Sequence, residues 1–125
     1  MRYLLDTHVL LWAAVSDKKL PDHVIDILEN TDIDVYYSVV CAWELAIKEA
    51  KGRIKLPGNF FTELPKLGFN CLGIKESYIH TLIKMPLTHS DPFDRMLAAQ
   101  AQAENMTLIT CDKKILEYPI KILVI

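Results

Sequence analysis

Four acidic residues lie where the sequence is otherwise apolar: Asp6, Glu44, Asp94 and Asp112. They end, interrupt or head the apolar stretches 2–5, 39–47, 93–99 and 108–111. Carboxylates are rarely buried unless they are paired or bind a metal. Their oxygen atoms suit hard ions such as Mg²⁺ and Mn²⁺, which can orient a water and stabilise charge on a phosphoryl group. The set therefore indicates a divalent-cation site.

Glu44 shares the apolar stripe of a predicted helix with Val40, Trp43 and Ile47, which stand at helical spacing from it. Leu45 and Lys48 are expected on other faces. A carboxylate on the core-facing side needs a partner. A buried salt bridge or a hydrogen bond to the backbone is the alternative to a metal ion.

Asp94 presents the same problem, because Leu97, Ala98 and Ala101 share its helical face. Asp91, one turn earlier, is well placed as the helix N-cap, with Arg95 as its ion-pair partner at i+4. That arrangement explains Asp91 and leaves Asp94 without an explanation.

Asp6 and Asp112 each follow a predicted strand and precede a predicted helix. Each can therefore be an N-cap only. In open α/β sheets, however, ligand sites form outside the carboxyl ends of the strands, and both residues stand at that edge. Both interpretations remain open from the residues alone.

Short apolar strands alternate with helices along the chain. Strands are predicted at 2–6, 34–38, 69–74, 106–111 and 120–124. Helices are predicted from residue 7, at 21–30, 39–51, 76–84 and 91–105, with short ones from residue 60 and at 112–116. Unalternating apolar strands are typical of a parallel sheet covered on both faces. On the 76–84 helix, we expect Ile79, Leu82 and Ile83 to face inward.

Length and composition favour one domain over residues 1–125 with a substantial core, since 51% of the residues are hydrophobic. The net charge of −2 gives no basic nucleic-acid sleeve. Neither a signal-peptide core nor a membrane span is recognisable, so we expect a cytoplasmic protein. We expect Cys41, Cys71 and Cys111 to be packed thiols, and Trp12 and Trp43 to belong to the core.

Four segments together resemble the PIN domain, and more narrowly the VapC-type toxins of bacterial toxin–antitoxin pairs. They are LDTHVLLW (5–12), WELAIK (43–48), HSDPFDRMLAAQA (89–101) and LITCD (108–112). The resemblance covers nearly the whole chain, and the DPFDR segment is its most specific part. It implies a three-layer α/β/α sandwich with a mainly parallel central sheet, and a metal-dependent ribonuclease.

The resemblance also implies site residues. The acidic quartet falls on Asp6, Glu44, Asp94 and Asp112, with Asp91 as a neighbour that can bind the metal through water. Thr7 and Thr110 match hydroxyl positions that contact the acids or a phosphate. Family members often carry a basic residue where this chain has Cys111.

We hypothesise that Asp6 and Asp94 are the principal ligands of Mg²⁺ or Mn²⁺. Glu44 would position a metal-bound water or a second ion, and Asp112 would complete the shell. Attack of that water on phosphorus would leave a 5′-phosphate and a 3′-hydroxyl, as the resemblance implies.

Basic residues gather after the Glu44 helix: Lys48, Lys51, Arg53 and Lys55. They form either a solvated helix end, whose cations suit the dipole, or a rail for an RNA backbone. His8 and His89 stand near acidic motifs and can contact a substrate.

Other functions remain open at this stage. A PIN-like domain can be a non-catalytic module that binds RNA or protein. A phosphotransferase could use Asp6 as nucleophile, although His8 occupies the position where such enzymes commonly carry a second Asp. The same acids can cleave DNA.

A toxin-like nuclease implies an antitoxin partner, and Trp12, Phe60 and Phe61 are candidate contacts for it. A homodimer is also compatible with the sequence.

Overall fold

A five-stranded, all-parallel sheet forms the centre of the computed structural model, which describes residues 1–87 and 90–125. The strand order is β3-β2-β1-β4-β5. The strands are β1 (Arg2–Leu5), β2 (Asp34–Ser38), β3 (Asn70–Leu72), β4 (Thr107–Thr110) and β5 (Lys121–Val124). The parallel sheet predicted from short, unalternating apolar strands is confirmed.

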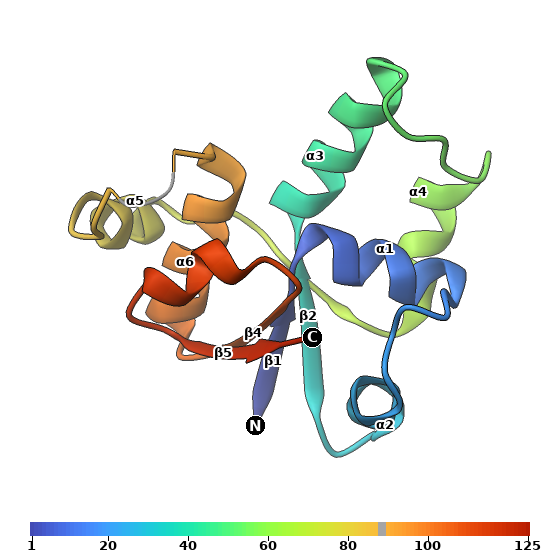
Figure 1. Ribbon diagram of the computed structural model, residues 1–125, viewed down its shortest axis with the longest axis horizontal. Coiled ribbons are helices and arrows are strands. Elements are labelled where there is room, and N and C mark those ends of the chain that lie inside the picture. The colour runs from blue at the N-terminus through green and yellow to red at the C-terminus, as the bar shows by residue number, and fades with distance from the viewer. Residues whose placement is uncertain (88–89) are drawn as a thin grey trace.

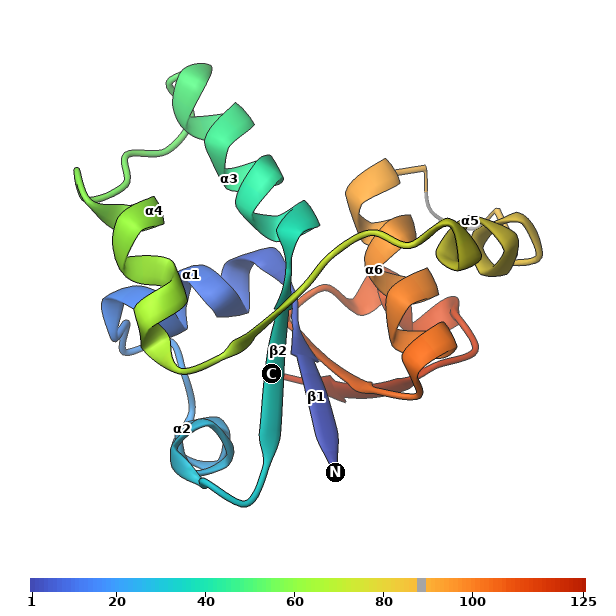
Figure 2. The same cartoon turned by 180° about the vertical axis from the view of Figure 1, so that it is seen from behind.

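Helices lie on both sides of the central strands. They are α1 (Thr7–Val15), α2 (Asp22–Glu29), α3 (Val39–Ala50), α4 (Phe60–Glu63), α5 (Glu76–Ile83) and α6 (Pro92–Glu104). Two 3-10 helices, η1 (Leu64–Leu67) and η2 (Lys113–Glu117), complete the set. Figures 1 and 2 show α1, α2 and α4 on one side of the sheet and α5 and α6 on the other, while α3 extends beyond its edge. The expected α/β/α sandwich is thereby confirmed.

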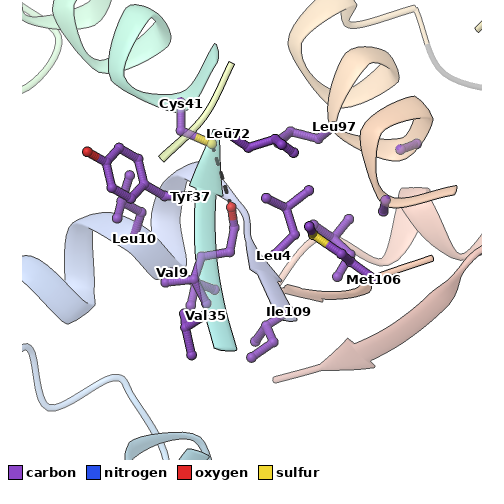
Figure 3. Close-up of a cluster of buried hydrophobic side chains, with 14 of the residues drawn as sticks. Leu4, Val9, Leu10, Val35, Tyr37, Cys41, Leu72, Leu97, Met106 and Ile109 are labelled. Carbon is purple, nitrogen blue, oxygen red and sulfur yellow. Dashed lines mark hydrogen bonds between the residues drawn. The ribbon is translucent and has the colours of Figure 1, made fainter. Parts of the chain in front are cut away.

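The core is centred on β1 and β4. Leu4 and Leu5 of β1 and Leu108 and Ile109 of β4 are fully buried, and several of their neighbours are drawn in Figure 3. Successive side chains of a strand point to opposite faces, so uninterrupted burial means that both faces are covered. Burying each such side chain stabilises the fold by about 1.5–3 kcal/mol.

The carboxyl ends of β1, β2 and β4 lie side by side. Leu5 of β1 pairs with Tyr37 of β2 on one flank and with Ile109 of β4 on the other. The chain moves outward from β1 to β2 and β3, then returns to β4 beside β1. Such a reversal of strand order opens a crevice at the carboxyl edge, where ligands bind in open α/β sheets. A ligand-binding site is therefore expected at the carboxyl edge between β1 and β4.

Side-chain caps begin the helices that leave this edge. Asp6 caps α1, Ser38 caps α3 and Asp91 caps α6, each accepting a hydrogen bond from a backbone N–H of the first turn. At the other end of α3, Gly52 has a φ of 71°, a left-handed conformation that glycine adopts without steric cost. The sequence-predicted helix starts and the Gly52 stop agree with these positions.

Three sequence expectations about packing are wrong. Ile79 and Ile83 of α5 are exposed, because this helix turns Tyr78 toward the core instead. Trp43 is 57% exposed, because its ring lines a surface groove and not the core. Cys71 is exposed on the edge strand β3.

Within residues 1–87 and 90–125, the structure contains no helix with both the length and the apolar character needed to cross a membrane.

Candidate active site at the carboxyl edge of the sheet

Asp6 occupies the centre of this edge, directly after β1, and its carboxylate is held on both oxygens. Oδ1 accepts a hydrogen bond from the backbone N–H of Val9 at 2.9 Å, and Oδ2 accepts a short one from the Thr110 hydroxyl. The residue is only 6% exposed. Burial raises the pKa of Asp6 above 3.8, while the hydrogen bonds from Thr110 and Val9 oppose that rise. Asp6 is thus both the N-cap of α1 and a desolvated acid in the core of the crevice.

Glu44 reaches the same edge from the second turn of α3. Its Oε1 accepts a hydrogen bond of 2.6 Å from the Thr7 hydroxyl, and its Oε2 lies 2.9 Å from the Lys48 ammonium. Its burial agrees with the apolar stripe predicted for α3. The expectation that Lys48 points elsewhere is wrong, because residues four apart on a helix are neighbours. Leu45 is likewise buried rather than on an outer face.

Asp112 follows β4 and caps the 3-10 helix η2. Its Oδ1 accepts a hydrogen bond from the backbone N–H of Lys114 at 3.0 Å, and its own N–H donates to the Thr110 hydroxyl oxygen at 3.0 Å. Thr110 therefore links Asp112 to Asp6 through a single hydroxyl group. The two acids leave adjacent parallel strands and share one polar bridge.

Asp91 and Asp94 stand at the start of α6. Asp91 is the N-cap, and its Oδ1 accepts from the backbone N–H groups of Phe93 and Asp94 at 2.8 and 3.1 Å. Arg95, which was expected to pair with Asp91 at i+4, contacts two backbone carbonyl oxygens. The Arg95 guanidinium donates to the carbonyl oxygens of Pro86 and Leu82 at 2.9 and 3.3 Å. Asp94 is half-buried in the first turn of α6. His89 lies outside the described residues.

The negative charges of the acids raise the pKa of two cysteine thiols, Cys111 and Cys41. Burial, followed by the negative charges of Asp6, Asp112 and Asp94, raises the pKa of the Cys111 thiol. Burial together with the charges of Asp6 and Glu44 raises the pKa of Cys41 to about 12. The Cys41 sulfur donates to the carbonyl oxygen of Leu5 at 3.6 Å (Figure 3). The charges of Asp6, Asp112 and Asp94 thus raise the pKa of Cys111, and those of Asp6 and Glu44 raise the pKa of Cys41, so Asp6 affects both thiols.

Cys111 lies beside the candidate site, although its apolar neighbourhood in the sequence predicted a packed thiol. It is only half-buried and stands among three carboxylates. The available signal was its position between Thr110 and Asp112 at the end of a strand.

The acids offer the oxygen donors that a hard cation prefers, but their side chains do not form a closed set of ligands. Among the described residues, no three Asp, Glu, His or Cys side chains lie close enough together to hold a metal ion. Carboxylate oxygens nonetheless match the preference of Mg²⁺ and Mn²⁺. Each carboxylate oxygen of Asp6 and Glu44 already contacts one hydrogen-bond donor. An ion bound at these two side chains would share those oxygens with the donors or displace them.

The basic residues predicted to contact an RNA backbone do not lie together. Lys48 forms an ion pair with Glu44 of the candidate site. Lys51 and Arg53 are exposed at the far end of α3, which Figure 1 shows extending away from the sheet.

An apolar groove of about 450 Å³ adjoins the site between α3, α5 and α6. Trp43, Ile74, Leu87 and Phe93 line it, and the rings of Trp43 and Phe93 meet edge to face at 5.1 Å. The groove and the acids share α3 and α6.

Comparison with known proteins agrees with this architecture. The family model of the PIN domain matches residues 3–121. No curated protein gives a significant match. Among solved structures, a chain of DNA-bound VapBC2 from Rickettsia felis is 18% identical, with a TM-score of 0.75, and the match covers 100% of this chain and 99% of that one.

Two further structures are similar. A chain of DNA-bound VapBC from Salmonella typhimurium is 18% identical over 99% of this chain and 98% of that one, with a TM-score of 0.73. A chain of FitAcB from Neisseria gonorrhoeae is 21% identical over 97% and 96%, with a TM-score of 0.68. At these identities the likeness concerns the fold.

Proposed function

The chain belongs to the PIN domain family, and on that premise we propose that it is a metal-dependent endoribonuclease, the toxin of a type II toxin–antitoxin pair. The observation that carries the proposal is the Thr110 hydroxyl, which contacts both the Asp6 carboxylate and the Asp112 backbone N–H at the switch point of the sheet. Glu44 is held at the same edge by the hydroxyl of Thr7, the residue that follows Asp6. N-caps alone do not explain why four acids gather at one edge.

The proposed roles of the acids are those hypothesised from the sequence and the family resemblance. Asp6 and Asp94 hold the ion, Glu44 orients the attacking water or a second ion, and Asp112 completes the shell. A bound Mg²⁺ or Mn²⁺ would supply charge neutralisation at the phosphate and a more acidic water. The hydroxyl groups of Thr7 and Thr110 fix the directions of Glu44 and Asp6, and the half-buried Cys111 leaves this edge without the basic residue common in the family.

The decisive experiment is cleavage-site mapping on total RNA with Mg²⁺ or Mn²⁺. We expect discrete cuts that EDTA prevents, and loss of at least about 100-fold in rate for Asp94→Ala and Asp6→Asn. Both variants must remain folded by circular dichroism. A matched single-stranded DNA of the same sequence tests the alternative substrate.

Each result of this experiment has a distinct meaning. Metal-dependent cutting of DNA alone would replace the RNA assignment. Binding of RNA without cleavage under any metal would leave the non-catalytic module as the function. Full activity of Asp6→Asn would remove Asp6 from the site.

An antitoxin is the proposed protein partner, because the similar solved structures are VapBC and FitAB complexes. Of the candidate contacts, Phe60 is buried in the core, Trp12 is half-buried and Phe61 is exposed. Phe61 is therefore the residue of the three best placed to meet a partner. Co-expression with the product of an adjacent gene should abolish RNA cleavage, and Phe61→Ala should weaken that inhibition.

A further inference from the structure

The two most buried acids of the site are satisfied by four donors, and those donors differ in kind. Asp6 is held by the Val9 backbone N–H and the Thr110 hydroxyl. Glu44 is held by the Thr7 hydroxyl and the Lys48 ammonium. Among these four, Lys48 is the charged donor, so Glu44 has a counter-charge at hydrogen-bond distance within its own helix, whereas the two donors that hold Asp6 are neutral.

Lys48 is also the donor best able to leave. Thr7 and Thr110 are buried, and the Val9 N–H is part of the first turn of α1. The Lys48 side chain is 27% exposed against 11% for Glu44, and it ends a flexible four-carbon stem. An ammonium on such a stem can move into water while the helix stays in place.

A divalent ion and the Lys48 ammonium compete for the same place. An ion held by the Glu44 carboxylate would stand close to the Lys48 ammonium, whose Nζ lies 2.9 Å from Oε2. Two cations that share one carboxylate repel each other, and the repulsion is stronger in a partly desolvated crevice than in water. The Lys48 ammonium must therefore move away from the Glu44 carboxylate when an ion binds there.

We propose that Lys48 is a positioning residue that acts as the internal counter-ion of Glu44, and that a divalent metal ion must displace it to bind. This inference rests on the proposed metal centre and adds a residue that sets its affinity. Lys48 keeps Glu44 ordered and neutralised before the ion arrives. The displaced ammonium is then released to the exposed side of α3, where it no longer repels the ion.

Titration with Mn²⁺, followed by electron paramagnetic resonance of the free ion, tests the inference without any cleavage assay. The variants are Lys48→Met, which removes the charge, and Lys48→Arg, which keeps it. Lys51→Met is the matched control, because Lys51 is exposed directly after the last residue of α3 and the substitution removes the same charge. All titrations use the full chain at one ionic strength of about 0.1 M, where distant exposed charges are largely screened.

We expect Lys48→Met to bind Mn²⁺ at least about fivefold more tightly than the unmodified chain, the lower end of a typical coupling between sites. Lys48→Arg and Lys51→Met should remain within about twofold. Thermal melts provide a second readout. The rise in melting temperature on adding Mn²⁺ should be larger for Lys48→Met, since that variant alone has an unneutralised Glu44 for the ion to satisfy.

Two results would overturn the inference, and they are distinguishable. If Lys48→Met binds Mn²⁺ no more tightly than Lys51→Met, Lys48 is a structural ion pair and the metal centre itself stands. If neither the unmodified chain nor any variant binds Mn²⁺, the proposed metal centre fails and the inference fails with it.

Discussion

Asp6 and Glu44 show two ways of keeping a carboxylate inside this protein. Hydrogen bonds from an amide and a hydroxyl hold Asp6, and the net effect of its surroundings is a raised pKa. Glu44 has an ammonium at 2.9 Å in addition to its hydroxyl partner. Burial therefore disfavours the charged form of Asp6. A bound cation would favour that charged form and would offset this cost.

The first prediction concerns the stability of the metal-free protein. A pKa raised in the folded state means that the contribution of Asp6 to stability is present below its unfolded pKa and is lost as pH rises through the folded value. Asp6→Asn removes that loss and keeps an oxygen for the cap. At pH 7 with EDTA, it should increase the free energy of unfolding by about 0.5–2 kcal/mol.

Urea unfolding at pH 7 and at pH 4 checks this expectation. The advantage of Asp6→Asn should shrink at the lower pH, where the native carboxyl gains its proton. Added Mn²⁺ should stabilise the unmodified chain more than the variant. A variant that is less stable than the unmodified chain at pH 7 would show that the cap and hydroxyl bonds outweigh the cost of burial.

At the level of single residues, the sequence predicted which acids matter better than what they contact. An acid on an apolar stripe is visible from spacing, so the burial of Glu44 was predictable. The ion pair between Glu44 and Lys48 could also have been predicted from their i+4 spacing, but Lys48 was expected on another face of the helix. The hydroxyl bridge from Thr110 to Asp6 joins residues 104 positions apart, and such a contact depends on strand order, which spacing does not contain.

At the level of elements, α6 depends on Asp91 for the position of Asp94. The Asp91 side chain accepts from the N–H of Asp94 itself, so the cap also fixes the backbone that carries the acid. Asn is as good an N-cap as Asp, whereas Ala is a poor one. We therefore expect Asp91→Asn to retain stability and cleavage, and Asp91→Ala to lose about 0.5–2 kcal/mol of stability together with part of its activity.

Thermal unfolding and RNA cleavage of both variants separate the two roles that the sequence left open for Asp91. A stable but inactive Asp91→Asn would mean that the negative charge acts on the metal, through water, in addition to capping. Equal activity in the unmodified chain and Asp91→Asn would assign the residue to the cap.

The sequence located the helices and strands closely but predicted their outer faces less well. Caps and turns such as Asp6, Ser38 and Gly52 act locally, so each boundary can be read from its own neighbourhood. Burial is not local. Helix α5 has an apolar stripe at the expected spacing, but it covers the edge of the molecule, so Ile79 and Ile83 remain in solvent.

At the level of the whole molecule, several exposed apolar residues line the groove beside the candidate active site. The groove between α3, α5 and α6 is lined by Trp43, Ile74 and Leu87, all of them exposed. Ile83 adds a further exposed apolar side chain on α5. Contiguous apolar patches on a protein surface mark interaction sites. If the homodimer that the sequence leaves open forms, we expect it to use this face, with the same contacts on both subunits.

Light scattering after size-exclusion chromatography tests this expectation with Ile74→Glu, which places a charge in the groove. In a twofold interface the change acts on both subunits, and burying an unpaired charge should raise the dissociation constant at least about 100-fold. The control is Leu116→Glu on η2, because Leu116 is about as exposed as Ile74, at 53% against 50%, and lies outside the groove. We expect a dimer for the unmodified chain and for Leu116→Glu, and a monomer for Ile74→Glu. A monomeric unmodified chain at tens of micromolar, or a dimer that survives Ile74→Glu, would mean that the groove meets a different partner, and the antitoxin would be the next one to test there.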